Sequence, residues 1–202
     1  MSDERTVPAH EGRAEVRERA SRFLAFVSPV ATPEEAAALV ARLRKEYHDA
    51  THVAFAWKIG SGASTRERAS DAGEPSGTAG KPIAAAIASA AVTDVVVAVI
   101  RYFGGTKLGT GGLSRAYRRA AEAAIAAAER KTLRETVLVV VTCPYERLGS
   151  ARRLLRSPGV TLASETFAVE PVLRLEVLRS RLPGLVADLD ESRLPYEIVP
   201  GA

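Results

Sequence analysis

Two glycine-rich loops, each carrying one lysine, hold the residues of this chain that are best suited to chemistry. The first runs from Gly73 to Pro82 (GEPSGTAGKP) and the second from Gly104 to Gly112 (GGTKLGTGG), and together they hold eight of the chain's 15 glycines. Glycine is unfavourable in regular structure, so this crowding indicates backbone with positive φ or backbone that another group approaches closely. Free N–H groups in such loops, and the start of a following helix, attract negative charge. The loops therefore predict an anion-binding site.

The elements around the loops would position these amide groups. Val95 to Ile100 is a run of mostly β-branched residues, which predicts a central strand before the second loop. Pro82 suits the first turn of a helix after the first loop, and Leu113 to Lys131 is helical in character after the second. Each loop would thus lead into the N-terminus of a helix.

We expect loop residues and the cations around them to contact the ligand. The predicted anion- or nucleic-acid-binding residues are Glu74, Ser76, Gly77, Thr78, Gly80, Lys81, Arg101, Gly104, Gly105, Lys107, Gly109, Gly111, Gly112, Arg115 and Arg118, with Arg119 as a further nearby cation. The loops match no standard nucleotide motif: Pro75 and Pro82 stand where a Walker loop needs glycine and Ser or Thr, and Ser114 replaces the last glycine of a dinucleotide fingerprint. No catalytic residue, metal or cofactor is expected.

Several of these residues have alternative interpretations. Asp71 and Glu74 could hold Mg²⁺ while Lys81 holds a phosphate; alternatively, Glu74 caps a helix or pairs with Lys81 or Arg101. The glycines could simply let two strand-to-helix turns pack tightly.

Aromatic and histidine side chains near the loops also allow more than one reading. Tyr102, Phe103 and Tyr117 are interleaved with arginines, and we expect one of the three to be exposed for base stacking. His48 and His52 are interpreted as capping or hydrogen-bonded residues rather than metal ligands.

The strings SDAGEPSGTAGKPI (residues 70–83) and VIRYFGGTKLGTGGLSRAY (99–117) closely resemble the signature of the YigZ/IMPACT family. ASRF (20–23) and HDATHVAFAW (48–57) fit it as well, whereas Ala72 stands where the family more often has a polar residue. The resemblance implies an IMPACT-type domain over residues 1–132, similar to the second domain of ribosomal protein S-five and to domain four of elongation factor G. It implies a ferredoxin-like domain over 135–202, similar to the last domain of that factor. Eukaryotic relatives regulate translation by competing for an activator of a stress kinase.

The hydrophobic pattern predicts an α+β fold in two parts. In the first, strands at 13–16, 22–30 and 51–59 and a helix capped by Thr32 would place helices on one face of a mixed sheet. Residues 1–12 are expected to fray, 61–70 to form a mobile loop and 132–135 to form a linker. From residue 136 the order is βαββαβ, with helices at 146–156 and 182–192, as in a ferredoxin-like domain.

Composition narrows the class of protein. The net charge is +4, with +5 over residues 1–134 and −1 over 135–202, so the first part is compatible with nucleic acid. No apolar run approaches a membrane span, the charged N-terminus is unlike a signal peptide, and Cys143 is the single cysteine. We therefore expect a cytoplasmic protein without a membrane partner.

These observations together predict a translation-linked regulatory or binding protein that grips RNA, the ribosome or another polyanion through the glycine loops. One alternative is a regulator that binds a large protein of the translation machinery in a stress-response pathway. Another is a small phosphate-handling enzyme that uses Asp71, Glu74 and Lys81.

Overall fold

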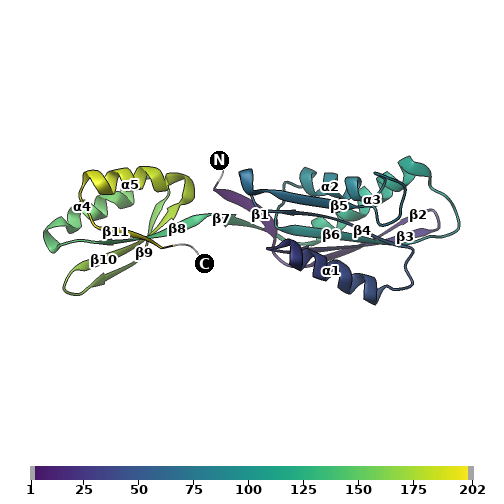
Figure 1. The fold of residues 1–202 in the computed structure, drawn as a ribbon, viewed down its shortest axis with the longest axis horizontal. Coiled ribbons are helices and arrows are strands. Elements are labelled where there is room, and N and C mark those ends of the chain that lie inside the picture. The colour runs from purple at the N-terminus through teal and green to yellow at the C-terminus, as the bar shows by residue number, and fades with distance from the viewer. Residues whose placement is uncertain (1–2, 200–202) are drawn as a thin grey trace. The chain divides into compact units, whose positions relative to one another are not determined.

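The computed structural model describes residues 3–199, which form two compact α+β units (Figure 1). One unit spans Arg5–Leu133; of the described residues, the other combines 3–4 with 134–199. Among the described residues, no helix is long and apolar enough to cross a membrane.

A five-stranded antiparallel sheet forms the centre of the first unit, in the order β2-β3-β6-β4-β5. Its strands are β2 (Gly12–Glu18), β3 (Ser21–Pro29), β4 (His52–Ile59), β5 (Arg66–Ser70) and β6 (Val95–Tyr102). The helices are α1 (Pro33–Glu46), α2 (Gly80–Ser89) and α3 (Gly109–Ala127). The strands β1 (Glu4–Pro8) and β7 (Arg130–Arg134) pair with each other in a separate sheet.

Helices cover both faces of the five-stranded sheet, so the prediction that they lie on one face is wrong. Within this unit α2 and α3 lie on one side of the strands and α1 on the other (Figure 1). The central strand β6 explains this arrangement, because its residues are buried on both faces. Val97 and Val99 pack in the core beneath α2 and α3, whereas Ala98 and Ile100 pack on the side of α1.

The helix predicted from Thr32 begins as its sequence indicates. The Thr32 side chain accepts a hydrogen bond from the Glu35 N–H (3.2 Å), and the Glu35 carboxylate accepts one from the N–H of Ala31 (2.7 Å). The first bond satisfies an amide group of the first turn, and the second holds the residue before the cap against the helix.

Three segments expected to lack regular structure are strands. Residues 4–8 of the expected frayed tail form β1, and residues 66–70 of the expected mobile loop form β5. The strand β7 takes in the end of the expected helix (residues 130–131) and most of the expected linker (residues 132–134). The sequence RERAS of β5 lacks the alternation of apolar and polar residues that predicts a strand. The reason is that β5 is an edge strand whose residues are mostly exposed. Backbone pairing with β4, rather than burial, determines its conformation.

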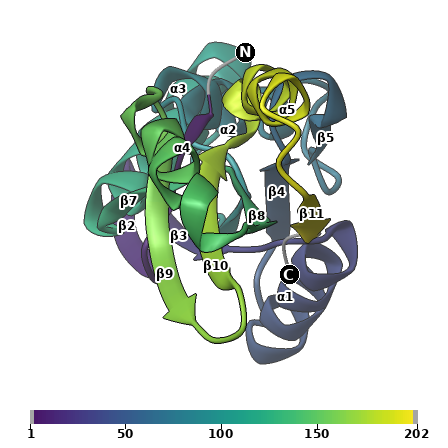
Figure 2. The ribbon, with the colours of Figure 1, turned by 90° about the vertical axis from the view of Figure 1, so that its left-hand side faces the viewer.

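The second unit has the predicted ferredoxin-like βαββαβ order. Its elements are β8 (Thr136–Thr142), α4 (Leu148–Arg153), β9 (Val160–Phe167), β10 (Pro171–Leu178), α5 (Leu182–Glu191) and β11 (Tyr196–Val199). The four strands form one antiparallel sheet, β11-β8-β10-β9, with the β9–β10 hairpin visible in Figure 2. Both helices pack on one face, over a core that contains Cys143. Burial raises the pKa of the Cys143 thiol, as do the nearby acidic residues Glu170 and Glu165.

Candidate functional site

The first glycine loop is closed by an anion of its own, the carboxylate of Asp71. Its oxygens accept hydrogen bonds from the backbone N–H groups of Gly77 (2.8 Å), Ala79 (3.0 Å) and Gly80 (2.8 Å). Burial alone would raise the pKa of Asp71, but these backbone hydrogen bonds and the charge of Lys81 together lower it. The prediction that the amides of Gly77 and Gly80 bind an external anion is therefore wrong, because the side chain of Asp71, just before the loop, already accepts their hydrogen bonds.

Glu74 points from the first loop into the protein and forms a buried polar network. Its Oε1 atom accepts hydrogen bonds from Nη1 of Arg101 (2.6 Å) and from the hydroxyl of Tyr117 (2.7 Å). Burial, and then the hydrogen bond to Glu74, raise the pKa of the Tyr117 phenol. One of the two interpretations of Glu74, pairing with Arg101, is thus confirmed.

His52 lies at the side of this network. Its Nδ1 atom is 2.9 Å from the carbonyl oxygen of Ala72, an acceptor, so Nδ1 carries a proton. Its Nε2 atom faces Oε2 of Glu74 at 3.8 Å. Because β4 and β6 pair in the register that puts His52 opposite Arg101, the sheet itself brings the imidazole to the site. The interpretation of His52 as a hydrogen-bonded residue is confirmed.

The second glycine loop is anchored at its start by two hydroxyl groups. The N–H of Phe103 donates to Oγ1 of Thr51 (3.1 Å), and the N–H of Gly104 donates to Oγ of Ser21 (3.4 Å). A side chain at Gly104 would have its Cβ only 1.9 Å from the carbonyl oxygen of Ala20, so no other residue fits there. Gly104 is therefore explained by close packing, the structural alternative considered for the loop glycines.

The rest of this loop runs directly into α3, which begins at Gly109, earlier than predicted. Gly111 and Gly112 thus lie in the first turn of the helix rather than before it. The preceding residue, Leu108, provides no side-chain hydrogen bond to the helix. The first amides of a helix have no partner within it and sit at the positive end of its dipole. In contrast to α2, α3 therefore presents its N-terminus without an internal carboxylate.

The two loops line one pocket of about 460 Å³. Its lining residues are Thr51, His52, Glu74, Pro75, Arg101, Phe103, Lys107, Leu108, Gly109, Thr110 and Leu113. Phe103 is 45% exposed, whereas Tyr117 is fully buried and Tyr102 is partly buried and donates to Asp49. The expectation that one of the three aromatic residues is exposed is therefore confirmed. A polar floor of Glu74 and Arg101 underlies largely apolar walls.

The cations near the pocket differ in whether a carboxylate pairs with them. Arg118 pairs with Glu122, and Arg119 pairs with Glu18. The exposed residues Lys107 and Arg115 form no ion pair within residues 3–199, whereas the charge of Lys81 lies close enough to Asp71 to lower its pKa. Buried Arg101 binds Glu74, yet its Nε atom has no hydrogen-bond partner. Uncompensated positive charge thus remains at the pocket and beside it.

The structure brings together only part of the predicted set. Glu74, Arg101, Lys107 and Gly109 line the pocket, whereas Ser76, Gly77, Thr78, Gly80 and Lys81 do not, and Arg115 and Arg118 lie further along α3. Sequence reasoning missed Thr51, His52, Pro75, Leu108, Thr110 and Leu113 as pocket residues. The only signal for most of them was that they lie next to the glycine-rich strings in sequence. Thr51 could be placed at the pocket only once the pairing of β4 with β6 was known.

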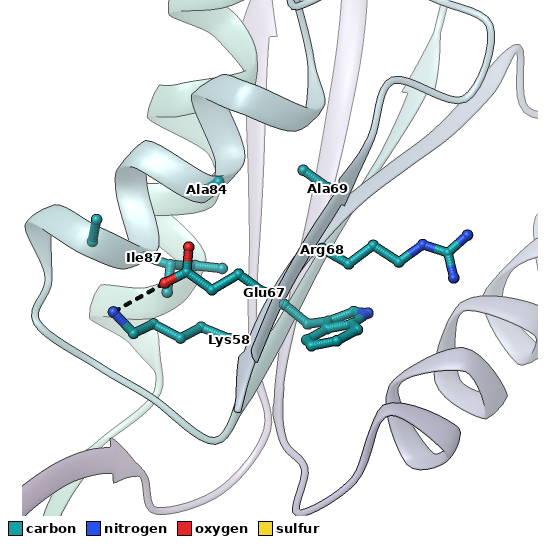
Figure 3. Close-up of a pocket in the computed structure, with 8 residues that line it drawn as sticks. Lys58, Glu67, Arg68, Ala69, Ala84 and Ile87 are labelled. Atoms are coloured by element: carbon teal, nitrogen blue, oxygen red, sulfur yellow. Dashed lines mark ion pairs between the residues drawn. The ribbon is translucent and has the colours of Figure 1, made fainter. Parts of the chain in front are cut away.

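A smaller pocket of about 160 Å³ lies between α2 and the β4–β5 edge of the sheet (Figure 3). Its two facing charges, Lys58 and Glu67, form an ion pair with each other at 3.2 Å, and α2 contributes Ala84 and Ile87 to its wall. Arg68 points away from this pair in Figure 3. Because Lys58 and Glu67 neutralise each other there, we place the candidate site in the larger pocket. Among residues 3–199, no cluster of three or more His, Cys, Asp or Glu is arranged to hold a metal.

Comparison with known proteins identifies the family. The profile of the Impact N-terminal domain matches residues 19–125, a range that contains both glycine loops. The chain belongs to the IMPACT family. The IMPACT family member in the pol 5' region of Thermus thermophilus is 44% identical over 152 residues, 75% of this chain and 80% of the relative. The IMPACT family member YigZ of Escherichia coli (strain K12) is 33% identical over 172 residues, 84% of this chain and 83% of the relative.

A solved structure supports the fold. The crystal structure of a protein described as hypothetical covers 100% of this chain and 100% of its own, with 28% identity and a TM-score of 0.67. The resemblance to the YigZ/IMPACT family inferred from the two glycine strings is thereby confirmed, and so is the two-part α+β architecture.

Proposed function

We propose that this protein is a cytoplasmic, translation-linked regulator that binds RNA, free or on the ribosome, at the pocket between its glycine loops. The link to translation rests on membership of the IMPACT family, whose eukaryotic members act on translation. The choice of RNA rests on one observation: Lys107 and Arg115 have no carboxylate partner in the described chain and flank the uncapped start of α3. Phosphate oxygens suit both the cations and the helix amides.

The structure argues against a Mg²⁺-dependent phosphate-handling site at Asp71 and Glu74. Asp71 already accepts three hydrogen bonds from the backbone of the first glycine loop, and Glu74 is paired with Arg101 and accepts from Tyr117, which leaves only its Oε2 atom without a hydrogen bond. The two carboxylates serve different partners. We therefore retain the binding role and not the enzymatic alternative.

Salt dependence tests the proposal. Filter binding of a single-stranded RNA of about ten nucleotides should give an affinity that falls as salt rises, because bound phosphates release counterions. The slope of log K against log salt is negative, and each lost phosphate contact makes it less steep by about 0.7 for single strands. The variant Lys107→Ala/Arg115→Ala should therefore bind more weakly, with a slope smaller by about 1.4.

A matched control separates a local effect from net charge. Arg44→Ala/Lys45→Ala removes two exposed cations from α1, which lies on the opposite face of the sheet from α3, and should leave the slope unchanged. Undetectable RNA binding by the unaltered protein at low salt, or binding without a salt slope, would refute the proposed function.

A further inference from the structure

We infer that the pocket receives a single unstacked nucleotide of the bound RNA, with its base against Phe103 and its phosphate at the start of α3. This inference rests on the proposed RNA binding. It goes beyond it because the bases, and not only the phosphate charges, would then contribute to the affinity. The relevant distinction is between a strand that lies on a basic surface and one whose nucleotide enters a pocket.

The size and lining of the pocket suit a nucleotide. At about 460 Å³ it falls within the range of small-molecule sites, which are mostly apolar with a few placed polar groups. Pro75, Leu108 and Leu113 line it together with Phe103, whereas a site for phosphate alone has no need of such apolar residues. The apolar lining therefore indicates a ligand with an apolar face, such as a nucleobase.

Phe103 is the side chain best placed to stack on a base. The guanidinium carbon of Arg101 lies 5.4 Å from the centre of its ring, and the side chain remains 45% exposed. Single exposed apolar side chains are common on protein surfaces, but Phe103 lies at a pocket, and base stacking on an aromatic ring does not depend on sequence. Arg101 therefore supports one side of a ring that is available to a base.

The floor of the pocket has polar atoms that its own residues do not satisfy. Oε1 of Glu74 accepts two hydrogen bonds, but Oε2 faces only Nε2 of His52, at 3.8 Å. The Nε atom of Arg101 has no partner, although Arg101 is only 5% exposed. An ionised carboxylate only accepts hydrogen bonds, so Oε2 suits an N–H group on the edge of a base.

The phosphate would lie where α3 begins. Lys107, Gly109 and Thr110 line the pocket where α3 begins, and no side chain caps that helix. A phosphate there meets backbone N–H groups, the positive end of the helix dipole and one ammonium group. The lining of one pocket thus includes groups that suit the base and groups that suit the phosphate of a nucleotide.

Two probes distinguish a nucleotide from an anion: a single-stranded RNA of about ten nucleotides and inorganic polyphosphate of similar charge. Phe103→Ala should weaken RNA binding about tenfold or more while leaving polyphosphate binding unchanged, because stacking contributes only with bases. Phe103→Trp should restore RNA binding. Phe167→Ala, which removes another exposed phenylalanine from the second unit, should change neither affinity.

The outcomes separate this inference from the function on which it rests. If Phe103→Ala leaves RNA affinity unchanged, or weakens both probes equally while circular dichroism shows a folded protein, the nucleotide pocket is wrong although RNA binding stands. If the unaltered protein binds polyphosphate as tightly as RNA, the site recognises negative charge alone and the inference is again overturned. If it binds neither, the proposed function fails and this inference fails with it.

Discussion

Nη1 of Arg101 lies 2.6 Å from Oε1 of Glu74, which makes these residues, 27 positions apart in sequence, a buried ion pair. Their side chains are only 6% and 3% exposed. The pair joins the central strand β6 to the first glycine loop, and the Tyr117 hydroxyl ties α3 to the same carboxylate. The polar floor of the pocket is therefore held by the core of the first unit.

Removing one partner of this pair should destabilise the first unit strongly. Glu74→Gln leaves the Arg101 charge buried without a counter-charge, which typically costs about 3–5 kcal/mol. Urea unfolding followed by fluorescence of Trp57, the chain's single tryptophan and a residue of β4, would measure the free energy of unfolding. The double variant Glu74→Gln/Arg101→Met should be more stable than Glu74→Gln alone, because no buried charge then lacks a partner. A cost below about 1 kcal/mol for Glu74→Gln would contradict this account.

Asp71 should make the stability of the first unit depend on pH. Its folded-state pKa lies below the ordinary value of 3.8, so its stabilising contribution is fully present above that value and is lost as pH falls through the folded pKa. Asp71→Asn replaces one accepting oxygen by a donor and should cost about 2 kcal/mol at pH 7. Unfolding of both proteins at pH 7, 5, 4 and 3 should show a constant difference down to about pH 4 and a smaller one below it. A difference that is the same at pH 3 as at pH 7 would rule out the carboxylate charge as its cause.

Much of the architecture could be predicted from the sequence because its signals are local. The Thr32 capping pattern, the β-branched run of β6 and the βαββαβ order each depend on neighbouring residues, and each is present in the structure. The strands β1, β5 and β7 could not be predicted in this way. They are short, polar or at an edge, so long-range pairing and not their own pattern makes them strands.

The site was predictable only in part for a related reason. The glycine strings indicated where the backbone is unusual, but not which amides are already satisfied. Asp71 precedes Gly77 and Gly80 by several residues, and only the folded loop shows that its carboxylate binds their N–H groups. The pairing of β4 with β6 likewise brings His52 beside Arg101, a proximity that the spacing of these residues in sequence does not indicate.

Two glycines of the second loop should respond differently to alanine. The Cβ of Gly104→Ala would lie 1.9 Å from the backbone oxygen of Ala20, so the loop must move, and we expect a loss of about 3 kcal/mol together with weaker RNA binding. Gly111 lies in the first turn of α3 with its nearest added contact at 3.4 Å, to the flexible end of Arg115. Gly111→Ala should therefore be neutral or stabilising. Equal stabilities of the two variants, measured by urea unfolding, would show that the Gly104 contact is not restrictive.

Ala91, just beyond the end of α2, offers a stabilising substitution. It is exposed and has a φ of 52°, a left-handed conformation that costs residues with a Cβ about 1 kcal/mol and that glycine adopts readily. Helices commonly end with glycine at this position, so Ala91→Gly should raise the free energy of unfolding by up to about 1 kcal/mol. The exposed helical residue Ala88 is a matched control, because Ala88→Gly should lower it by about 1 kcal/mol through the poor helix propensity of glycine. If both substitutions destabilise to the same extent, backbone strain at Ala91 does not contribute to the stability of this unit.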